Sequence, residues 1–236
     1  MSDRLRLGIA GLGTVGIGVV KIIQRHADLL EARCGKRIEI TAVSARDRTK
    51  NRSADLSDYA WETDPVALAR RDDVDVFVEV MGGSDGPAKA ATEAALAAGK
   101  DVVTANKALL AVHGQALAET AEATGRVIRF EAAVAGGIPV IKALTEGLAG
   151  NAIRRVMGVM NGTCNYILTR MESAGLPYET VFEEARQLGY LEADPNLDVG
   201  GIDAGHKLSL LAAIAFGTRV SFDAVELEGI GRVSID

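Results

Sequence analysis

Cysteine is scarce in this chain of 236 residues, which contains only Cys34 and Cys164. Two cysteines cannot form a framework of several disulfides, so a small disulfide-stabilised fold is excluded. Such low cysteine usage is typical of a reducing compartment, and we expect a cytoplasmic location. No apolar run approaches the roughly 20 residues of a membrane-spanning helix. The N-terminal segment also lacks the apolar core and cleavage pattern of a signal peptide, so we expect neither a leader nor a membrane partner.

A basic surface is also missing. The formal net charge is -6, and the basic residues are scattered apart from one short patch at 46–52. A protein that binds nucleic acid usually carries a basic stripe, so we expect no nucleic-acid partner. Hydrophobic residues make up 48% of the chain and charged residues 25%. This composition is sufficient for a real core and predicts two globular domains.

Short apolar segments alternate with helical patterns through the first 150 residues. Apolar periodicity predicts strands at 5–10, 38–44, 74–81, 101–104 and 127–131, and helices at 17–30, 88–98, 114–123 and 139–148. The almost wholly apolar third strand is typical of a parallel sheet that is covered on both faces. The alternation predicts an α/β domain with a doubly wound parallel sheet over residues 1–150.

The pattern changes after Gly150. A strand at 153–160 and helices at 165–174 and 178–188 precede a segment rich in carboxylates, 189–207. An apolar helical run at 208–216 and a strand at 225–230 follow. Residues 151–236 therefore form a second domain, which we expect to be α+β.

A glycine pattern lies between the first predicted strand and the first predicted helix, where Gly11, Gly13 and Gly16 enclose Thr14 and Val15. In a Rossmann-type domain the first glycine permits a tight turn, the second lets a pyrophosphate approach, and the third allows close helix packing. The helix N-terminus attracts the phosphates. We therefore predict a dinucleotide site at residues 11–16. The alternative is a glycine-rich turn that binds no ligand.

The end of the second predicted strand indicates which dinucleotide is bound. NAD-preferring domains usually carry an acidic residue there, whereas this strand is followed by Arg46. A guanidinium can form paired hydrogen bonds with a ribose 2′-phosphate, which favours NADP over NAD. The alternative is a solvated loop of mixed charge.

Lys107 follows the fourth predicted strand directly. Ligands of open parallel sheets bind at the carboxyl ends of the strands, so a lysine there can orient a substrate or move a proton. An ordinary surface lysine is the equally acceptable alternative.

The carboxylate-rich segment contains the second candidate group. Asp203 and Lys207 are four residues apart and would share one helix face, beside an apolar run that predicts a helix buried nearly all round. Grouped carboxylates, which here include Glu192, Asp194 and Asp198, suit recognition of an ammonium group, and a lysine can transfer a proton to an oxygen. An ordinary helical ion pair is the alternative.

Two further residues invite a chemical role that the sequence does not support. His206 has no neighbours with metal-ligand spacing, so we interpret it as a packed or capping residue. Cys164 has no evident base nearby in the sequence, so we interpret it as a small buried residue rather than a nucleophile.

With these motifs assembled, the chain resembles the homoserine dehydrogenase family. The matching segments are the glycine turn 11–16, EVMGG at 79–83, TANK at 104–107, FEAAVAGGIP at 130–139, NGT at 161–163, and 189–207. The resemblance implies NAD(P)-linked interconversion of L-homoserine and L-aspartate 4-semialdehyde, on the route to threonine, isoleucine and methionine. It also implies a homodimer.

The resemblance assigns roles to individual residues. Lys107 and Lys207 would form the acid–base pair at the reacting oxygen, and Lys107 would also contact the cofactor. Asp203 would hold Lys207 or the substrate. The other implied substrate residues are Glu192 and Asp198 at the ammonium group, with Gly162, Thr163 and Tyr190 lining the pocket. A monovalent cation, Na⁺ or K⁺, would be held by Glu131 and by the carbonyl oxygens of Val134, Gly136 and Ile138.

The family's catalytic region also continues beyond the position of Asp236, so we expect the second domain, for substrate binding and dimerisation, to be incomplete. Two alternatives therefore stand beside the leading hypothesis. One is a non-catalytic dinucleotide-binding module. The other is a related dehydrogenase that uses aspartate semialdehyde through a cysteine nucleophile.

Overall fold

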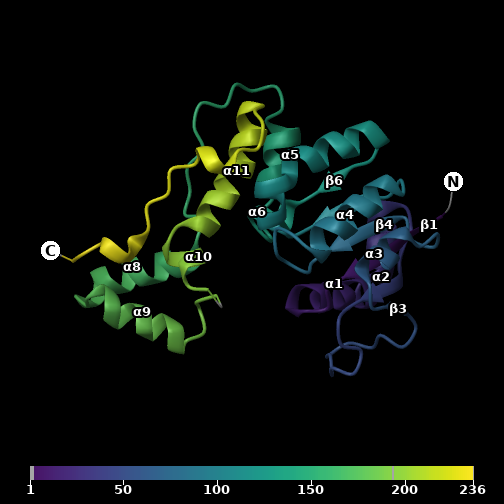
Figure 1. Cartoon of the computed structure of the whole chain (residues 1–236), viewed down its shortest axis with the longest axis horizontal. Helices are drawn as coiled ribbons and strands as arrows, with labels where there is room; N and C mark the ends of the chain where they lie inside the picture. Colours follow the sequence, from purple (N-terminus) through teal and green to yellow (C-terminus); the bar gives the residue numbers. More distant parts are fainter. Residues whose placement is uncertain (1–2, 193, 236) are drawn as a thin grey trace. The chain divides into compact units, whose positions relative to one another are not determined.

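The first part of the chain forms a parallel sheet. The computed structural model describes residues 3–192 and 194–235 (Figure 1). Within these ranges the strands are β1 (Arg4–Ala10), β2 (Arg37–Ser44), β3 (Ala60–Glu62), β4 (Val76–Glu79), β5 (Asp101–Thr104) and β6 (Ile128–Arg129). All neighbouring pairs are parallel, and the order is β3-β2-β1-β4-β5-β6. The predicted doubly wound α/β class is confirmed.

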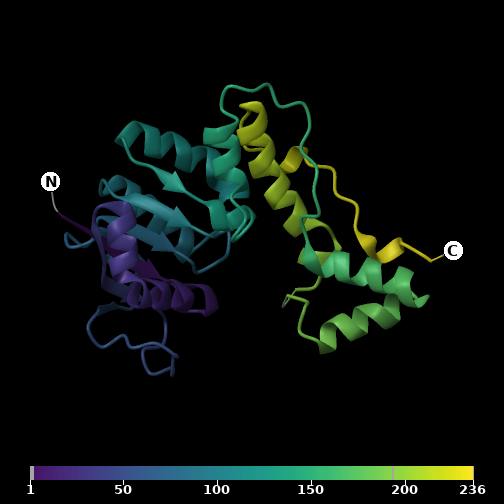
Figure 2. The same ribbon diagram turned by 180° about the vertical axis from the view of Figure 1, so that it is seen from behind.

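Helices cover both faces of this sheet. They are α1 (Thr14–Arg25), α2 (Ala27–Cys34), α3 (Pro65–Arg70), α4 (Pro87–Ala97) and α5 (Lys107–Thr124). Right-handed crossovers place α1 on one face, while α3, α4 and α5 pack side by side on the other. Figures 1 and 2 show α1 and α5 on opposite sides of the strands.

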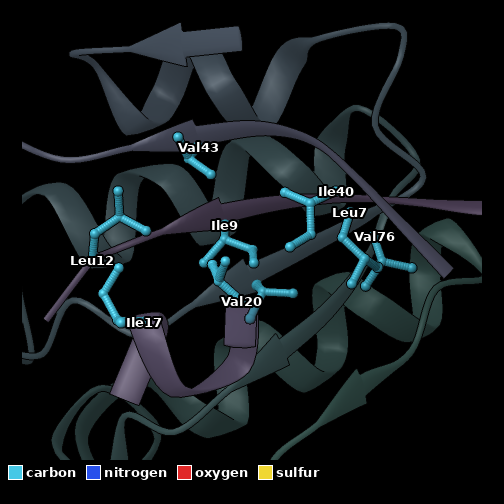
Figure 3. Close-up of a cluster of buried hydrophobic side chains, with 9 residues drawn as sticks. Leu7, Ile9, Leu12, Ile17, Val20, Ile40, Val43 and Val76 are labelled. Carbon is cyan, nitrogen blue, oxygen red and sulfur yellow. The ribbon is translucent and has the colours of Figure 1, made fainter. Parts of the chain in front are cut away.

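A cluster of branched side chains fills the space between β1 and α1 (Figure 3). Ile9 of β1 and Val20 of α1 are completely buried, and Ile40 and Val43 of β2 lie beside them. Strand β4 and the second half of β1 are buried at successive positions rather than at alternate ones, because helices cover both faces of the sheet there. This packing fixes where β1 ends, and therefore where the glycine turn begins.

The carboxyl ends of the strands form one edge of the sheet. The backbone N–H of Gly11 donates to Ser44 at the end of β2, 2.9 Å away, and Val80 donates to Ala10 at 2.9 Å. The strand order reverses between β1 and β4, and such a switch point is the usual ligand site of an open α/β sheet. The loops that follow β1, β2, β4 and β5 therefore surround one candidate binding edge.

Several predicted boundaries in this part need correction. The predicted helix at 17–30 is two helices, α1 and α2, which meet at His26. The prediction also missed β3 and α3, because segments of three and six residues give little periodic signal. Helix α5 begins at Lys107 instead of residue 114, because the Asn106 side chain caps its first turn.

The end of this part is also more broken than predicted. The strand at 127–131 is limited to β6, and α6 (Glu131–Val134) follows it. The predicted helix at 139–148 is α7 (Val140–Lys142) continued by the π-helix η1 (Ala143–Gly147).

The chain divides into two compact units, Met1–Val140 and Ile141–Asp236. The functional boundary predicted at residue 150 stays a prediction. The second unit contains α8 (Gly162–Ala174), α9 (Tyr178–Gln187), α10 (Asn196–Val199), α11 (Ile202–Phe216), and the 3₁₀ turns η2 (Phe222–Ala224) and η3 (Ile230–Arg232). Ile167 and Met171 of α8 pack on Val181 and Ala185 of α9 to form its core.

Two strands predicted in the second unit are wrong. Neither 153–160 nor 225–230 pairs with another segment among the described residues, and a strand exists only when its backbone joins a ladder. The run 208–216 is also less buried than predicted, since Phe216 is exposed and 212–215 are half-buried. No helix in the described ranges is long and apolar enough to cross a membrane.

Candidate functional site

The glycine turn has the shape that a dinucleotide requires. Gly11 has a φ of +99°, and a Cβ there would lie 2.5 Å from the carbonyl oxygen of Val80. A Cβ on Gly16 would lie only 1.9 Å from the carbonyl oxygen of Gly11. Gly13, in contrast, has nothing within 4 Å of its Cβ position. Gly11 and Gly16 are therefore required by the fold, whereas Gly13 leaves open space in which a pyrophosphate can approach the backbone.

The first residues of α1 complete this cradle. Thr14 and Val15 are exposed, and no side chain caps the helix at Gly13. The N–H groups of the first turn are thus available to a phosphate, as the sequence predicts.

The loop after β2 carries the predicted Arg46, which is exposed. The next residue, Asp47, accepts hydrogen bonds from the hydroxyl and the backbone N–H of Thr49, at 2.7 and 2.8 Å. These bonds lower the pKa of the Asp47 carboxyl, which is engaged within its own loop. The structure thus leaves Arg46 as the first side chain beyond β2 that could meet a ribose phosphate.

Arg52 also lies at the carboxyl edge of the sheet, beside the glycine turn, and the sequence predicts no role for it. Its Nε donates to the carbonyl oxygen of Leu12 in the glycine turn at 3.3 Å, and its Nη2 donates to the backbone carbonyl oxygen of Asp47 at 2.8 Å. Its guanidinium also lies 5.3 Å from the ring centroid of Trp61 in β3. Arg52 joins the basic loop to the turn across 40 residues of sequence, a separation that no local pattern reveals.

Lys107 is the first residue of α5 and is half-buried at the carboxyl edge of the sheet. Asn106 caps the helix, because its Oδ1 accepts the N–H of Leu109 at 3.1 Å. Lys107 thus lies just past a strand end, as the sequence predicts, but it begins a helix that the sequence predicts only from residue 114. Lys107 and Lys207 belong to different compact units, and their predicted pairing stays a prediction.

The predicted cation turn begins with α6 at Glu131 and passes Gly137 at a φ of +80°. A carboxylate and backbone carbonyl oxygens are hard donors that suit Na⁺ or K⁺. In the described parts of the chain, no group of three or more His, Cys, Asp or Glu side chains is arranged to hold a metal ion. A cation at this turn would therefore rely on the carbonyl groups of Val134, Gly136 and Ile138, and its presence stays a prediction.

Asp203 and Lys207 form an ion pair in the first turns of α11, with Nζ 2.7 Å from Oδ2. The side chains are 4% and 21% exposed, whereas the pair Lys142–Glu146, with the same spacing, is 56–68% exposed. The shared helix face predicted from the spacing is confirmed. Its burial argues against an ordinary solvated pair, because a charged group is desolvated only at a cost.

Asn161 links this pair to a second carboxylate. Its Nδ2 donates to Asp198 Oδ1 at 2.9 Å and to Asp203 Oδ2 at 3.1 Å, and its Oδ1 caps α8 by accepting the N–H of Cys164 at 2.8 Å. Lys207 also donates to the carbonyl oxygen of Met160 at 2.8 Å. One buried amide therefore brings Asp198, Asp203 and Lys207 together. No pattern in the sequence singles out Asn161, although it begins the NGT motif at 161–163.

The remaining predicted pocket residues border this cluster. Asp198 Oδ2 accepts the backbone N–H of Glu192 at 3.0 Å, and the Thr163 hydroxyl donates to the carbonyl oxygen of Tyr190 at 2.9 Å. Gly162, the residue before Thr163, begins α8. The segment 190–192 is thus tied both to α8 and to Asp198. Each oxygen of Asp198 keeps a second lone pair. Asp198 is only 3% exposed, and its contact with an ammonium group stays a prediction.

The structure supports the modest roles given to Cys164 and His206. Burial raises the pKa of the Cys164 thiol, and Asp198 and Asp203 raise it further. A reactive cysteine needs the opposite environment. His206 is buried with its ring centroid 4.4 Å from that of Phe222. These contacts favour packing over nucleophilic or metal chemistry.

Two family models match the chain in succession. Residues 11–131 match the model described as homoserine dehydrogenase, NAD binding domain, and residues 139–236 match the model described as homoserine dehydrogenase. The chain belongs to the homoserine dehydrogenase family. Its first unit is therefore the NAD(P)-binding domain of this family, as the sheet and the glycine turn predict.

Known homoserine dehydrogenases agree with this result. The enzyme of Neisseria gonorrhoeae is 46% identical over 97% of this chain. A crystal structure of a homoserine dehydrogenase from Thiobacillus denitrificans matches this chain with a TM-score of 0.93 and 42% sequence identity. The match covers 98% of this chain and 53% of that one. A hyperthermophilic archaeal homoserine dehydrogenase in complex with NADPH has a TM-score of 0.80, with 28% identity over 94% of this chain and 75% of that one. This chain spans about half the length of the curated relatives, 52% of the N. gonorrhoeae protein.

Proposed function

We propose that this chain carries out the NAD(P)-dependent interconversion of L-homoserine and L-aspartate 4-semialdehyde. The observation that carries the proposal is the buried Asn161–Asp198–Asp203–Lys207 cluster in a member of this family. The cluster supplies carboxylates for an ammonium group and an amine for a reacting oxygen. The glycine turn supplies a place for the cofactor.

Lys207 has the hydrogen-bonding capacity for a proton transfer. An ammonium group has three N–H donors, and among the described residues two are used by Asp203 and Met160. The third can donate to the aldehyde oxygen, and the neutral amine can accept the proton when the alcohol is oxidised. Asp203 keeps the amine in one orientation. The nicotinamide, when bound, supplies the hydride chemistry.

Glu192 and Asp198 would bind the substrate at the opposite end, through its ammonium group. A carboxylate accepts charge-assisted hydrogen bonds from an ammonium group, which are roughly twice as strong as neutral ones. Gly162, Thr163 and Tyr190 would line the same pocket, since Thr163 already fixes the backbone of Tyr190. Lys107 would be the second acid–base group, as the resemblance to the family implies.

An oxidation assay on the whole chain tests this proposal. Homoserine with NADP is expected to increase absorbance at the reduced-nicotinamide band, whereas 4-hydroxybutanoate, which lacks only the amino group, should give little turnover. A folded chain that binds NADP and turns over neither compound would establish the alternative of a non-catalytic dinucleotide-binding module. Loss of turnover on thiol alkylation of Cys164 would favour the cysteine-dependent dehydrogenase instead.

NADP preference is a separate part of the proposal, and Arg46 carries it. We expect Arg46→Ala to weaken NADP binding by about 10- to 100-fold and NAD binding only slightly, because hydrogen bonds between charged groups contribute about 1.5–3 kcal/mol. Fluorescence titration with both reduced cofactors measures this. The archaeal relative bound to NADPH supports the assignment.

Arg48→Ala is the matched control, because this substitution also removes one positive charge from the exposed loop after β2. Its guanidinium lies 5.9 Å from the Trp61 ring centroid. Equal losses in the two variants would assign the effect to the general charge of the loop and remove the specific role of Arg46.

Three more features belong to the same proposal. A monovalent cation, Na⁺ or K⁺, would bind Glu131 and the carbonyl oxygens of Val134, Gly136 and Ile138. The chain would form a homodimer, and it would act in the cytoplasm, as its low cysteine content favours. These features are supported by the resemblance to the family.

A further inference from the structure

Glu79 is a carboxylate inside the cofactor domain that has no part in the proposed reaction. It is the last residue of β4 and is 0% exposed. Its Oε1 accepts the backbone N–H groups of Met81 at 2.7 Å and Gly82 at 3.3 Å. Its Oε2 accepts the hydroxyl of Thr104 at 2.7 Å. One side chain therefore holds the loop after β4 and the end of β5 together.

The hydrogen bonds continue from Thr104 to the start of α5. The Thr104 hydroxyl oxygen accepts the N–H of Asn106 at 3.0 Å, and Asn106 Nδ2 donates to the carbonyl oxygen of Gly83 at 2.7 Å. The path from Glu79 through the loop 81–83, Asn106 and Thr104 thus closes into a ring. Asn106 also caps α5, so the ring fixes the residue that precedes Lys107.

A carboxylate is an unfavourable choice for this position if packing alone matters. Burial of a charged group is costly unless hydrogen bonds or a cation compensate for it, and no ion pair found among the described residues includes Glu79. An ionised carboxylate accepts hydrogen bonds and donates none, so it suits a site that presents three donors. The chemistry of Glu79 matches the task of fixing two loops rather than filling a core.

We propose that Glu79 is a positioning residue that sets the place of Lys107 and of the loop 81–83 at the carboxyl edge of the sheet. The inference deepens the proposed function and rests on it, because the consequence for turnover requires that Lys107 acts at the reacting end. Glu79 is completely buried, so it would act through Lys107 and the loop and not on the substrate or the cofactor directly.

Glu79→Gln tests the proposal with little change in shape. If the new amide nitrogen faces Met81 and Gly82, it opposes two N–H donors. If it faces Thr104, the hydroxyl must accept from it and from Asn106, which leaves the hydroxyl hydrogen without its acceptor. Either orientation leaves at least one donor of the ring without its acceptor. We expect kcat to fall by about 100-fold with a much smaller change in the KM for homoserine, because a displacement of about 1 Å is enough for such a loss.

Thr104→Val removes the other member of the ring, and Thr92→Val is its matched control. Thr92 is equally buried in the same domain, but among the described residues its hydroxyl donates only to the carbonyl oxygen of Ala88 within α4. Thr104→Val should lower kcat as Glu79→Gln does, and Thr92→Val should not. The double variant Glu79→Gln/Thr104→Val should lose no more than the larger single loss, because both changes act through one ring. If Glu79→Gln fails to fold, the kcat of Thr104→Val compared with that of Thr92→Val tests the proposal.

A second measurement is independent of turnover. Modification of the Lys107 amine by an amine-reactive reagent, followed by mass spectrometry, should be faster in both ring variants, because the start of α5 is less firmly held. If the parent chain does not oxidise homoserine, the proposed function fails for this chain, and labelling still tests the positioning of Lys107. A lower melting temperature with unchanged kcat and unchanged labelling would assign Glu79 to stability alone and overturn the proposal.

Discussion

Lys207→Met is expected to lower kcat for homoserine oxidation by about 100- to 10,000-fold, the usual contribution of a positioned proton-transfer group. Methionine keeps an unbranched apolar stem but removes the amine that Asp203 and Met160 hold. NADP affinity should change little, because the glycine turn belongs to the other compact unit. Steady-state kinetics and a fluorescence titration of the reduced cofactor measure the two quantities separately.

Lys142→Met is the control for this variant. Lys142 pairs with Glu146 at the same i,i+4 spacing and in the same unit, but both side chains are exposed. Its replacement should leave kcat within about twofold, because exposed pairs contribute roughly 0–1 kcal/mol. If a folded Lys207→Met variant retains the parent kcat, Lys207 is not the proton-transfer group, and Lys107 becomes the remaining candidate.

The fold could be predicted where a local pattern is strong. The predicted strand at 101–104 coincides with β5, and 5–10 differs from β1 by one residue, because both segments are short and apolar and each is followed by a turn or a helix start. The predicted strands at 153–160 and 225–230 are equally apolar in character, yet they lack a partner among the described residues. Local composition indicates that a segment can be a strand, but the ladder depends on segments distant in sequence.

The candidate site shows the same division. Asp203 and Lys207 could be paired from the sequence, because helix geometry fixes which residues four apart share a face. The link from Asn161 to Asp198 and Asp203 could not, because it spans 37 and 42 residues. The sequence could have predicted the helix cap at Asn106, since asparagine is a preferred N-cap residue. The prediction starts this helix at residue 114 instead, which leaves Lys107 outside the predicted helix.

Gly16→Ala is expected to lower the free energy of unfolding of the cofactor domain by about 3 kcal/mol, the upper range for overpacking. Its Cβ would lie 1.9 Å from the carbonyl oxygen of Gly11 and 3.2 Å from Val80 Cγ2. The first contact is with a backbone atom, so rotation of a side chain cannot relieve it. Helix α1 must instead move away from β1. Urea unfolding followed by the fluorescence of Trp61, the single tryptophan, reports on this domain. The displaced helix N-terminus should also weaken NADP binding.

Gly13→Ala and Gly18→Ala separate the effect of Gly16→Ala on stability from its effect on NADP binding. Both positions have open space around a new Cβ. Gly13→Ala should keep the parent stability but weaken NADP binding, because the methyl group occupies the space through which a pyrophosphate approaches. Gly18→Ala, within α1, should raise the free energy of unfolding by about 1 kcal/mol and leave binding unchanged. If Gly13→Ala binds NADP as the parent does, the pyrophosphate does not lie at this turn. If Gly16→Ala is as stable as Gly13→Ala, close packing of α1 on β1 is not what requires glycine at position 16.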